Sequence, residues 1–339
     1  MKSKLKLSIC IPTYNRPIHL DNCLNAILIA KKNSKSKNFF EVCVSDNGSK
    51  HNIKKIVKKY KNELDIKFYR YQRNFGITKN FLNSVNMAKG EFVWTIGNDD
   101  LLTPDAIQKV CNLLRDNPKV DYYFINSYNL NNKFLKKFSH PFNTKNFPKK
   151  MTRFSKKSNS EKLYFWELID PNISFDFLLG MFFSLFRRKL WNDNLKYLNM
   201  KKAYDKRWMS TFENTCFNTI IFGNAFKNSR AYFQAKPLTV NLYGVREWSR
   251  LYDFITIVRI PEILDYYRYC GMPLLRYLNC KNFALRDFSI SIGKIFLLKD
   301  VQGYQYLNFY KHIFKNLIFP NVYLSLIKYI LKKMIKLIR

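Results

Sequence analysis

Residues 1–115 alternate between short apolar runs and segments with helical periodicity, and this alternation constrains the fold more than any other feature of the sequence. Short apolar runs bounded by turn residues or charges predict four buried strands, at 7–12, 39–44, 66–71 and 91–96. Apolar residues at helical spacing predict helices between and after them, within 20–28, 53–60, 76–87 and 103–115. Strands separated by helices form βαβ units, so we expect a parallel sheet covered on both faces.

Polar clusters follow three of the predicted strands. Thr13-Tyr14-Asn15-Arg16 follows the first strand, Asp46 lies in a turn after the second, and Asn98-Asp99-Asp100 follows the fourth. Ligands of such sheets bind at the carboxyl ends of the strands, so we expect these residues to share one cleft. The first cluster lacks the G-x-G-x-x-G pattern of a dinucleotide site, which argues against an NAD enzyme.

Two features of this cleft have a functional and a plain structural interpretation. Adjacent carboxylates such as Asp99 and Asp100 repel each other unless a cation lies between them and a ligand, and Mg²⁺ typically uses one or two carboxylates plus substrate phosphates. The alternative is a pair of acids capping the helix that begins at Pro104. Asp46 suits an acceptor for a nucleobase or ribose donor, or closes an ordinary Asx-turn.

The chain carries 59 Lys and Arg against 24 acids, a formal net charge of +35. This excess reflects either the codon usage of an AT-rich genome or attraction to an anionic membrane, nucleic acid or phosphorylated substrate. The positive charge is diffuse and dominated by Lys, and no nucleic-acid reading module is visible, so we expect no nucleic-acid partner.

The cysteine pattern and the hydropathy of the sequence indicate the cellular compartment of the protein. The seven cysteines include no C-x-x-C pair, which favours a reducing environment and argues against a zinc site. The N-terminus lacks the features of a signal peptide, and the longest apolar stretch, 177–186, is too short to span a bilayer. We therefore expect a cytoplasmic protein with only peripheral membrane contact.

The C-terminal segment predicts a basic amphipathic helix. Apolar residues recur at helical spacing from Tyr323 to Ile338, and basic residues fill the other side, at Lys328, Lys332, Lys333, Lys336 and Arg339. Such a helix typically binds an anionic membrane surface, which we expect here to be the inner face of the cytoplasmic membrane. The alternative is a helix packed on the protein's own core.

Five motifs in order carry a resemblance to a known family. They are Ile11–Arg16, Val44–Ser49, Arg73–Gly76, Ala88–Phe92 and Gly97–Asp100. Over residues 5–115 the chain resembles family 2 glycosyltransferases of the GT-A fold, and it looks closest to the abequosyltransferase-like group, which also carries Gly-x-Asp-Asp. The resemblance implies an α/β fold with a Rossmann-like mixed sheet that binds a nucleotide sugar and is flanked by helices. We predict a GT-A domain at 1–245, with a nucleotide-binding half at 1–120 and an acceptor-side half at 160–245, and a helical C-terminal region at 246–339.

The resemblance also implies roles for residues of the cleft. The family's Asp-x-Asp corresponds to Gly97-Asn98-Asp99, so Gly97 replaces the first acid and Asp99 keeps the metal-binding position for Mg²⁺ or Mn²⁺. Asp46 would contact the base, and we count Asp100 among the catalytic residues. The other residues expected to hold the nucleotide sugar are Pro12, Thr13, Tyr14, Asn15, Arg16, Asn74, Gly76 and Asn98.

The implied activity is transfer of a sugar from a nucleotide sugar to a saccharide or lipid-linked saccharide, in the biosynthesis of capsule, lipopolysaccharide or O-antigen. An inverting enzyme needs a general base, for which we predict Glu213, with Asp176 and Asp205 as rivals and a surface helix acid as the plain alternative. Arg246 suits a pyrophosphate clamp or is a solvated side chain. The competing interpretations of the whole chain are a non-catalytic GT-A-like protein that binds saccharides and a basic nucleic-acid-binding protein.

Overall fold

A mixed sheet of ten strands forms the centre of the computed structural model, which describes residues 6–36, 38–207, 209–244, 247–298 and 303–338. Eight strands follow the order β3-β2-β1-β4-β9-β6-β10-β5, while β7 pairs with β6 and β8 pairs with β10. Arg246 lies outside the described residues.

The N-terminal half of the sheet is parallel, as the sequence predicts. It contains β1 (Leu7–Thr13), β2 (Phe40–Asp46), β3 (Ile66–Arg70) and β4 (Phe92–Thr95). The register places Thr13 opposite Asp46, and Asp46 opposite Arg70. The carboxyl ends of these three strands therefore lie side by side.

Helices cover both faces of this half. The intervening helices are α1 (Pro17–Lys32), α2 (Ile53–Tyr60), α3 (Ile77–Asn86) and α4 (Ala106–Asp116). Side chains that alternate along β1 enter two separate cores: Ile9 and Ile11 pack with α1, α2 and α4, whereas Cys10 packs with Phe81 of α3. All seven cysteines are buried free thiols, and Cys10 and Cys43 fill the second core as small apolar residues.

The segment after β4 differs from the prediction of a helix beginning at Thr103. Asp100–Leu102 form a short strand, β5, which pairs antiparallel with β10, and α4 begins only at Ala106. Leu101 and Leu102 are fully buried in this pairing. The two acids are therefore no helix cap, because a strand separates them from α4.

Antiparallel strands make the second half of the sheet mixed. β9 (Ser184–Arg187) runs antiparallel to β4 and to β6 (Tyr122–Asn131), and β10 (Arg230–Tyr243) runs parallel to β6. The short strands at its margins are β7 (Thr152–Arg153) and β8 (Glu161–Tyr164), and short helices cover this half: α5 (Arg188–Asp193), α6 (Met200–Ala203), α7 (Phe212–Thr215) and α8 (Phe217–Ala225). The mixed sheet flanked by helices confirms the expected fold class.

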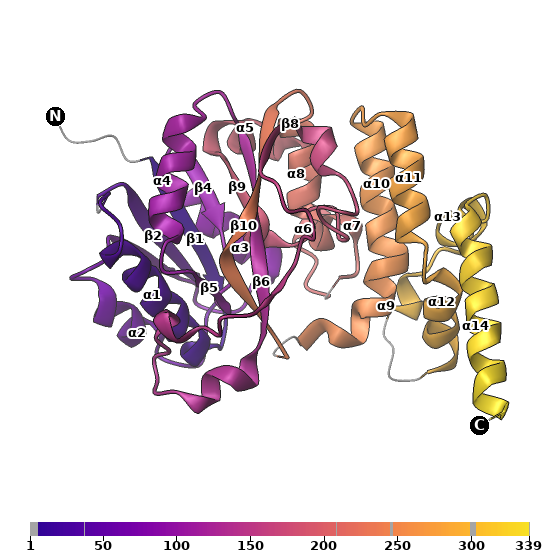
Figure 1. The fold of residues 1–339 in the computed structure, drawn as a ribbon, viewed down its shortest axis with the longest axis horizontal. Coiled ribbons are helices and arrows are strands. Elements are labelled where there is room, and N and C mark those ends of the chain that lie inside the picture. The colour runs from indigo at the N-terminus through magenta and orange to yellow at the C-terminus, as the bar shows by residue number, and fades with distance from the viewer. Residues whose placement is uncertain (1–5, 37, 208, 245–246, 299–302, 339) are drawn as a thin grey trace.

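Beyond β10 the chain is helical, as expected. Figure 1 shows the C-terminal helices gathered at the end of the molecule opposite β1, β2 and β3. They are α9 (Tyr252–Phe254), a π-helical turn over Ile255–Arg259, α10 (Ile260–Tyr269), α11 (Leu274–Ala284), α12 (Phe288–Leu297), α13 (Phe309–His312) and α14 (Pro320–Ile338). Within the described residues no helix has the length and apolarity needed to cross a bilayer. The boundary between 245 and 246 stays a prediction.

Candidate functional site

Thr13, at the end of β1, joins the polar residues that follow the neighbouring strands. Its hydroxyl oxygen accepts a hydrogen bond from Asn98 Nδ2 at 2.8 Å, and its carbonyl oxygen accepts from the backbone N–H of Asn47 at 3.0 Å. Asn80 Nδ2, from α3, donates to the same carbonyl at 3.2 Å. The predicted clusters therefore meet at one edge of the sheet.

Asp46 is fully buried at the end of β2. Its Oδ1 accepts hydrogen bonds from the backbone N–H and the hydroxyl of Ser49, so the carboxylate closes a turn, as the plain interpretation expects. Its Oδ2 has no hydrogen-bond donor among the described residues and lies 3.5 Å from Arg70 Nε. Oδ2 therefore keeps the capacity to accept a hydrogen bond.

Asn47 holds the segment from Asn74 to Gly76 against the β2 turn. Its Nδ2 donates to Asn74 Oδ1 at 2.8 Å and to the carbonyl oxygen of Gly76 at 3.1 Å, while its Oδ1 accepts from the N–H of Phe75 at 2.9 Å. A carboxylate at position 47 has no N–H with which to make the first two bonds. Gly76, at φ +92°, then leads into α3.

Asp99 and Arg16 form an ion pair at the opening of the site. Arg16 Nη1 lies 2.9 Å from Asp99 Oδ2, and both side chains are about one-fifth exposed, 22% and 19%. Burial lowers the pKa of the neighbouring His19, although the charge of Asp99 opposes this shift. Two residues that the sequence assigns to the donor site are thus in direct contact.

Asp100 lies deeper than Asp99. It is 1% exposed, its Oδ2 accepts from the N–H of Gly97 at 2.7 Å, and its Oδ1 accepts from Asn241 Nδ2 of β10 at 3.0 Å. The second of these bonds ties the turn that carries Asp99 to β10, in the mixed half of the sheet. Both bonds favour a positioning role for Asp100 over the predicted contact with reacting atoms.

Gly97 stands where the family's first acid is expected, and the carboxylates of Asp99 and Asp100 crowd the position that its Cβ would take. A Cβ added there would lie 2.7 Å from Asp99 Oδ1 and 2.8 Å from Asp100 Oδ2. The two carboxylates therefore already occupy the space that a third would need.

Gly97→Asp is accordingly expected to weaken the site, although it restores the acid pattern. The new side chain displaces Asp100 from the Gly97 N–H, and loss of a buried hydrogen bond to a charged group costs about 2 kcal/mol. We expect a lower thermal midpoint and weaker Mn²⁺ binding in the presence of nucleotide. Gly97→Ala separates the steric effect from the added charge. Tighter Mn²⁺ binding by Gly97→Asp would contradict this account.

The described residues of the site suit a metal ion shared with a bound substrate, and do not suit an ion held by the protein alone. Among the described residues, no three His, Cys, Asp or Glu side chains are grouped so that the protein alone could hold an ion. At the strand ends, Asp99 offers a partly exposed carboxylate, whereas Asp46 and Asp100 are buried. This arrangement fits a Mg²⁺ or Mn²⁺ ion shared between one carboxylate and the phosphates of a bound substrate.

Glu213 lies in the first turn of α7, next to the same cleft. Thr78 Oγ1, in the first turn of α3 just after Gly76, donates to the carbonyl oxygen of Asn214 at 3.0 Å. The Glu213 side chain is 19% exposed and lies 3.5 Å from Lys202 Nζ. It is therefore an accessible carboxylate beside the segment that leads into α3.

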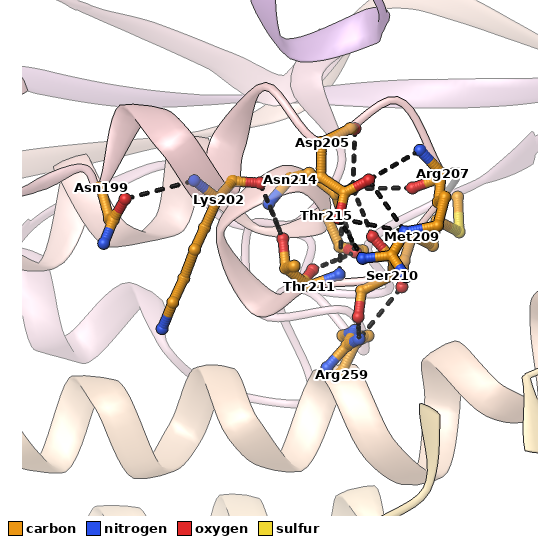
Figure 2. Close-up of polar contacts among 10 residues, drawn as sticks. All are labelled: Asn199, Lys202, Asp205, Arg207, Met209, Ser210, Thr211, Asn214, Thr215 and Arg259. Atoms are coloured by element: carbon orange, nitrogen blue, oxygen red, sulfur yellow. Dashed lines mark hydrogen bonds and ion pairs between the residues drawn. The ribbon is translucent and has the colours of Figure 1, made fainter. Parts of the chain in front are cut away.

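The two rival acids are less suited to accept a proton. Hydrogen bonds and charge from Arg207 lower the pKa of Asp205 to about 2, and Figure 2 shows this pair. Asp176 accepts from the N–H of Gly180 at 3.0 Å and from the hydroxyl of Ser174, so it stabilises its own turn. A general base works best with a pKa near the operating pH, which disfavours Asp205.

A parallel sheet with these polar strand ends, continued by antiparallel strands, is the arrangement of a GT-A glycosyltransferase fold. The model of the family described as "Glycosyl transferase family 2" matches residues 8–187, more than half of the 339 residues. The chain therefore belongs to glycosyltransferase family 2, and the expectation from the motifs is confirmed.

Individual relatives match only parts of the chain. The abequosyltransferase RfbV of Salmonella typhimurium is 36% identical over 104 residues, which cover 30% of this chain and 30% of that protein. The chondroitin synthase of Pasteurella multocida is 28% identical over 220 residues, which cover 62% of this chain and 21% of that protein. The chain thus spans less than a third of the length of either relative.

The fold has a counterpart among solved structures. The structure of residues 1–349 of TarS from S. aureus, in complex with UDP-GlcNAc, superimposes with a TM-score of 0.60 at 19% identity. The match covers 87% of this chain and 76% of that one, so the similarity of fold extends well beyond the nucleotide-binding half.

Proposed function

We propose that this chain transfers a sugar from a nucleoside-diphosphate sugar to a hydroxyl group of a saccharide or lipid-linked saccharide in surface polysaccharide biosynthesis. The observation that carries the proposal is the meeting of Thr13, Asn98 and Asp99 at one sheet edge, in a chain of glycosyltransferase family 2. Relatives named for abequose transfer and chondroitin synthesis support a product such as capsule, lipopolysaccharide or O-antigen.

In this proposal the nucleotide binds across the ends of β1, β2 and β4. Asp46 Oδ2 accepts from the base, and the segment of Asn74 and Gly76 contacts phosphate or sugar hydroxyls before α3. A Mg²⁺ or Mn²⁺ ion shared by Asp99 and the diphosphate would neutralise charge that develops on the leaving group. Arg16, which pairs with Asp99 at the opening of the site, would be placed to donate hydrogen bonds to the diphosphate.

The transfer step then requires one proton acceptor. The carboxylate of Glu213 takes the proton of the acceptor hydroxyl, whose oxygen forms a bond to the anomeric carbon of the donor. The bond between that carbon and the diphosphate oxygen breaks, and the nucleoside diphosphate leaves with the electron pair. Attack opposite the leaving group inverts the configuration at the anomeric carbon.

The test is a screen of nucleotide sugars with the purified full-length protein. We expect release of nucleoside diphosphate from at least one donor in the presence of Mg²⁺ or Mn²⁺, and loss of this release in EDTA. Metal-dependent nucleotide binding without turnover would identify a non-catalytic saccharide-binding protein. Neither binding nor turnover with any donor would overturn the proposal.

We also propose that α14 attaches the protein to an anionic membrane, at the inner face of the cytoplasmic membrane. The helix packs on α12 through Val322 and Ser325, and the Ser325 hydroxyl donates to Ser289 Oγ at 3.0 Å. Its apolar side chains face outward and are 46–56% exposed: Tyr323, Leu324, Leu326, Ile327, Ile330, Leu331, Met334 and Ile335. This orientation supports the membrane interpretation over packing on the core.

Charge points to the same partner. Residues 301–339 contain no acid and seven basic residues: Lys311, Lys315, Lys328, Lys332, Lys333, Lys336 and Arg339. Each basic residue near an anionic leaflet contributes about 1 kcal/mol to binding. A contiguous exposed apolar face of this kind typically marks an interaction site.

Charged substitutions on the outward face are expected to release the protein from anionic vesicles. The double variant Ile327→Glu/Ile330→Glu places two carboxylates where the apolar face meets lipid, so binding to phosphatidylglycerol vesicles in a sedimentation assay should be lost. Lys54→Glu on α2 changes the net charge by the same two units and should leave most of the binding. Unchanged sedimentation of the double variant, or a wild-type dimer that this variant breaks, would refute membrane attachment by α14.

A further inference from the structure

A polar cavity of about 380 Å³ lies between the segment around α7 and the C-terminal helical region. Lys202 and Glu213 line one wall, while Tyr306, Asn308 and Lys311 line the other. Its volume falls within the range of small-molecule sites, about 300–1,000 Å³. The proposed base therefore lines an open cavity whose opposite wall comes from the C-terminal region.

Arg259, from the π-helical turn, fixes the wall that carries Glu213. The guanidinium is buried, and its Nη2 donates to the carbonyl oxygens of Met209 and Ser210, each at 3.0 Å. Figure 2 shows both carbonyls directed at this one side chain. Met209 has a φ of +54°, a left-handed conformation that a non-glycine residue keeps only when its surroundings impose it.

Asn214 cross-links the same segment from within. Its Nδ2 lies within hydrogen-bond distance of the carbonyl oxygens of Asp205 and Arg207, at 3.2 and 2.8 Å, and of Ser210 Oγ at 3.1 Å. Thr211 Oγ1 also donates to the carbonyl oxygen of Lys202 at 3.0 Å. The wall is thus held in one conformation, as a site that positions a substrate requires (Figure 2).

A chain of buried polar contacts continues from Arg259 to the opposite wall. Arg259 pairs with Glu262, which in turn contacts His312 Nε2 at 3.2 Å and Lys311 Nζ at 2.5 Å. Because His312 Nδ1 accepts from the N–H of Asn308, its Nε2 carries a proton and donates to Glu262. Burial opposes ionisation of Glu262, but the contacts with His312, Arg259 and Lys311 lower its pKa to about 2.

We propose that this cavity binds the acceptor saccharide and that Arg259 is a positioning residue for it; the proposal rests on the proposed function. A carboxylate, an amide, a phenol ring and two ammonium groups line the space, and these groups suit a ligand with many hydroxyls. All of them come from residues beyond the segment 8–187 that matches the family. Acceptor choice would therefore depend on the part of the chain that the family motifs do not cover.

The test blocks the cavity at its exposed edge. The Lys202 side chain is 59% exposed, so Lys202→Trp adds bulk at the cavity without filling a core. In saturation-transfer NMR with methyl glycosides of common hexoses, we expect wild-type protein to bind at least one glycoside. Lys202→Trp should weaken that binding about tenfold or more, while its affinity for UDP or GDP stays within about twofold of wild type.

Lys201→Trp is the matched control, because Lys201 is the exposed neighbour on α6 and does not line the cavity. It should bind the glycoside as wild type does. Arg259→Gln should also weaken glycoside binding, and Arg259→Lys should restore part of it. The affinity of both variants for UDP or GDP should stay close to that of wild type. The proposal is overturned if no glycoside binds wild-type protein, or if Lys202→Trp binds it equally well. Loss of nucleotide binding by wild-type protein would instead count against the proposed function.

Discussion

Asp99→Asn is expected to abolish metal-dependent sugar transfer while leaving the fold intact. The amide matches the carboxylate in shape but carries no charge, so it cannot hold a divalent ion against the diphosphate. Removing an electrostatic contribution of this kind typically costs about 10²–10³-fold in kcat. The ion pair with Arg16 is also lost, but both partners are partly exposed, so the effect on stability should be small.

Two measurements separate the role of Asp99 from a general defect. Release of nucleoside diphosphate should fall, and Mn²⁺ bound in the presence of nucleotide, followed by electron paramagnetic resonance, should fall with it. Asp116→Asn, the same chemical change at an exposed position at the end of α4, should behave as wild type. Full metal-dependent activity in Asp99→Asn would show that the ion is held elsewhere.

Glu213→Gln is expected to produce the second large loss, in transfer to the acceptor. A glutamine cannot take the proton of the attacking hydroxyl, and general-base catalysis contributes about 10²–10⁴-fold. Nucleotide affinity should be unchanged, because Glu213 lies on α7 and not among the strand ends. If wild-type protein loses rate at acidic pH, this acidic limb should be absent from the residual activity of the variant.

The rival acids provide the comparison. Asp205→Asn and Asp176→Asn remove the same kind of charge from the second half of the chain, and we expect each to retain more transfer activity than Glu213→Gln. Exposed Glu63, which pairs with Lys32, serves as the control for a Glu-to-Gln change. If Asp176→Asn lost the acidic limb and Glu213→Gln kept it, the base would be Asp176.

Local patterns in the sequence were sufficient to predict the parallel half of the sheet. Each βαβ unit is built from residues close in sequence, so apolar runs and helical spacing locate β1 to β4 within one or two residues. The cluster of Thr13, Asn98 and Asp99 follows from this topology, because parallel strands end at the same edge.

Contacts between distant segments were not predictable in this way. The bond between Asp100 and Asn241 joins residues 141 positions apart. The strand β5 exists because β10 pairs with it, so the local sequence predicted only the helix that follows. Arg259 and Glu262 have the spacing of a helical ion pair, but nothing in their sequence indicates that Arg259 also binds the carbonyls of Met209 and Ser210. The second half of the chain is built from contacts of this long-range kind.

Membrane attachment through the outward apolar face of α14, as proposed above, would change how strongly the acceptor must bind. A protein held at a surface meets a lipid-linked substrate by diffusion in two dimensions, and tethering of this kind creates effective concentrations on the order of millimolar. An acceptor cavity with weak intrinsic affinity would then still be filled. Weak affinity would have an advantage of its own, because the glycosylated product would leave quickly and free the enzyme for the next acceptor.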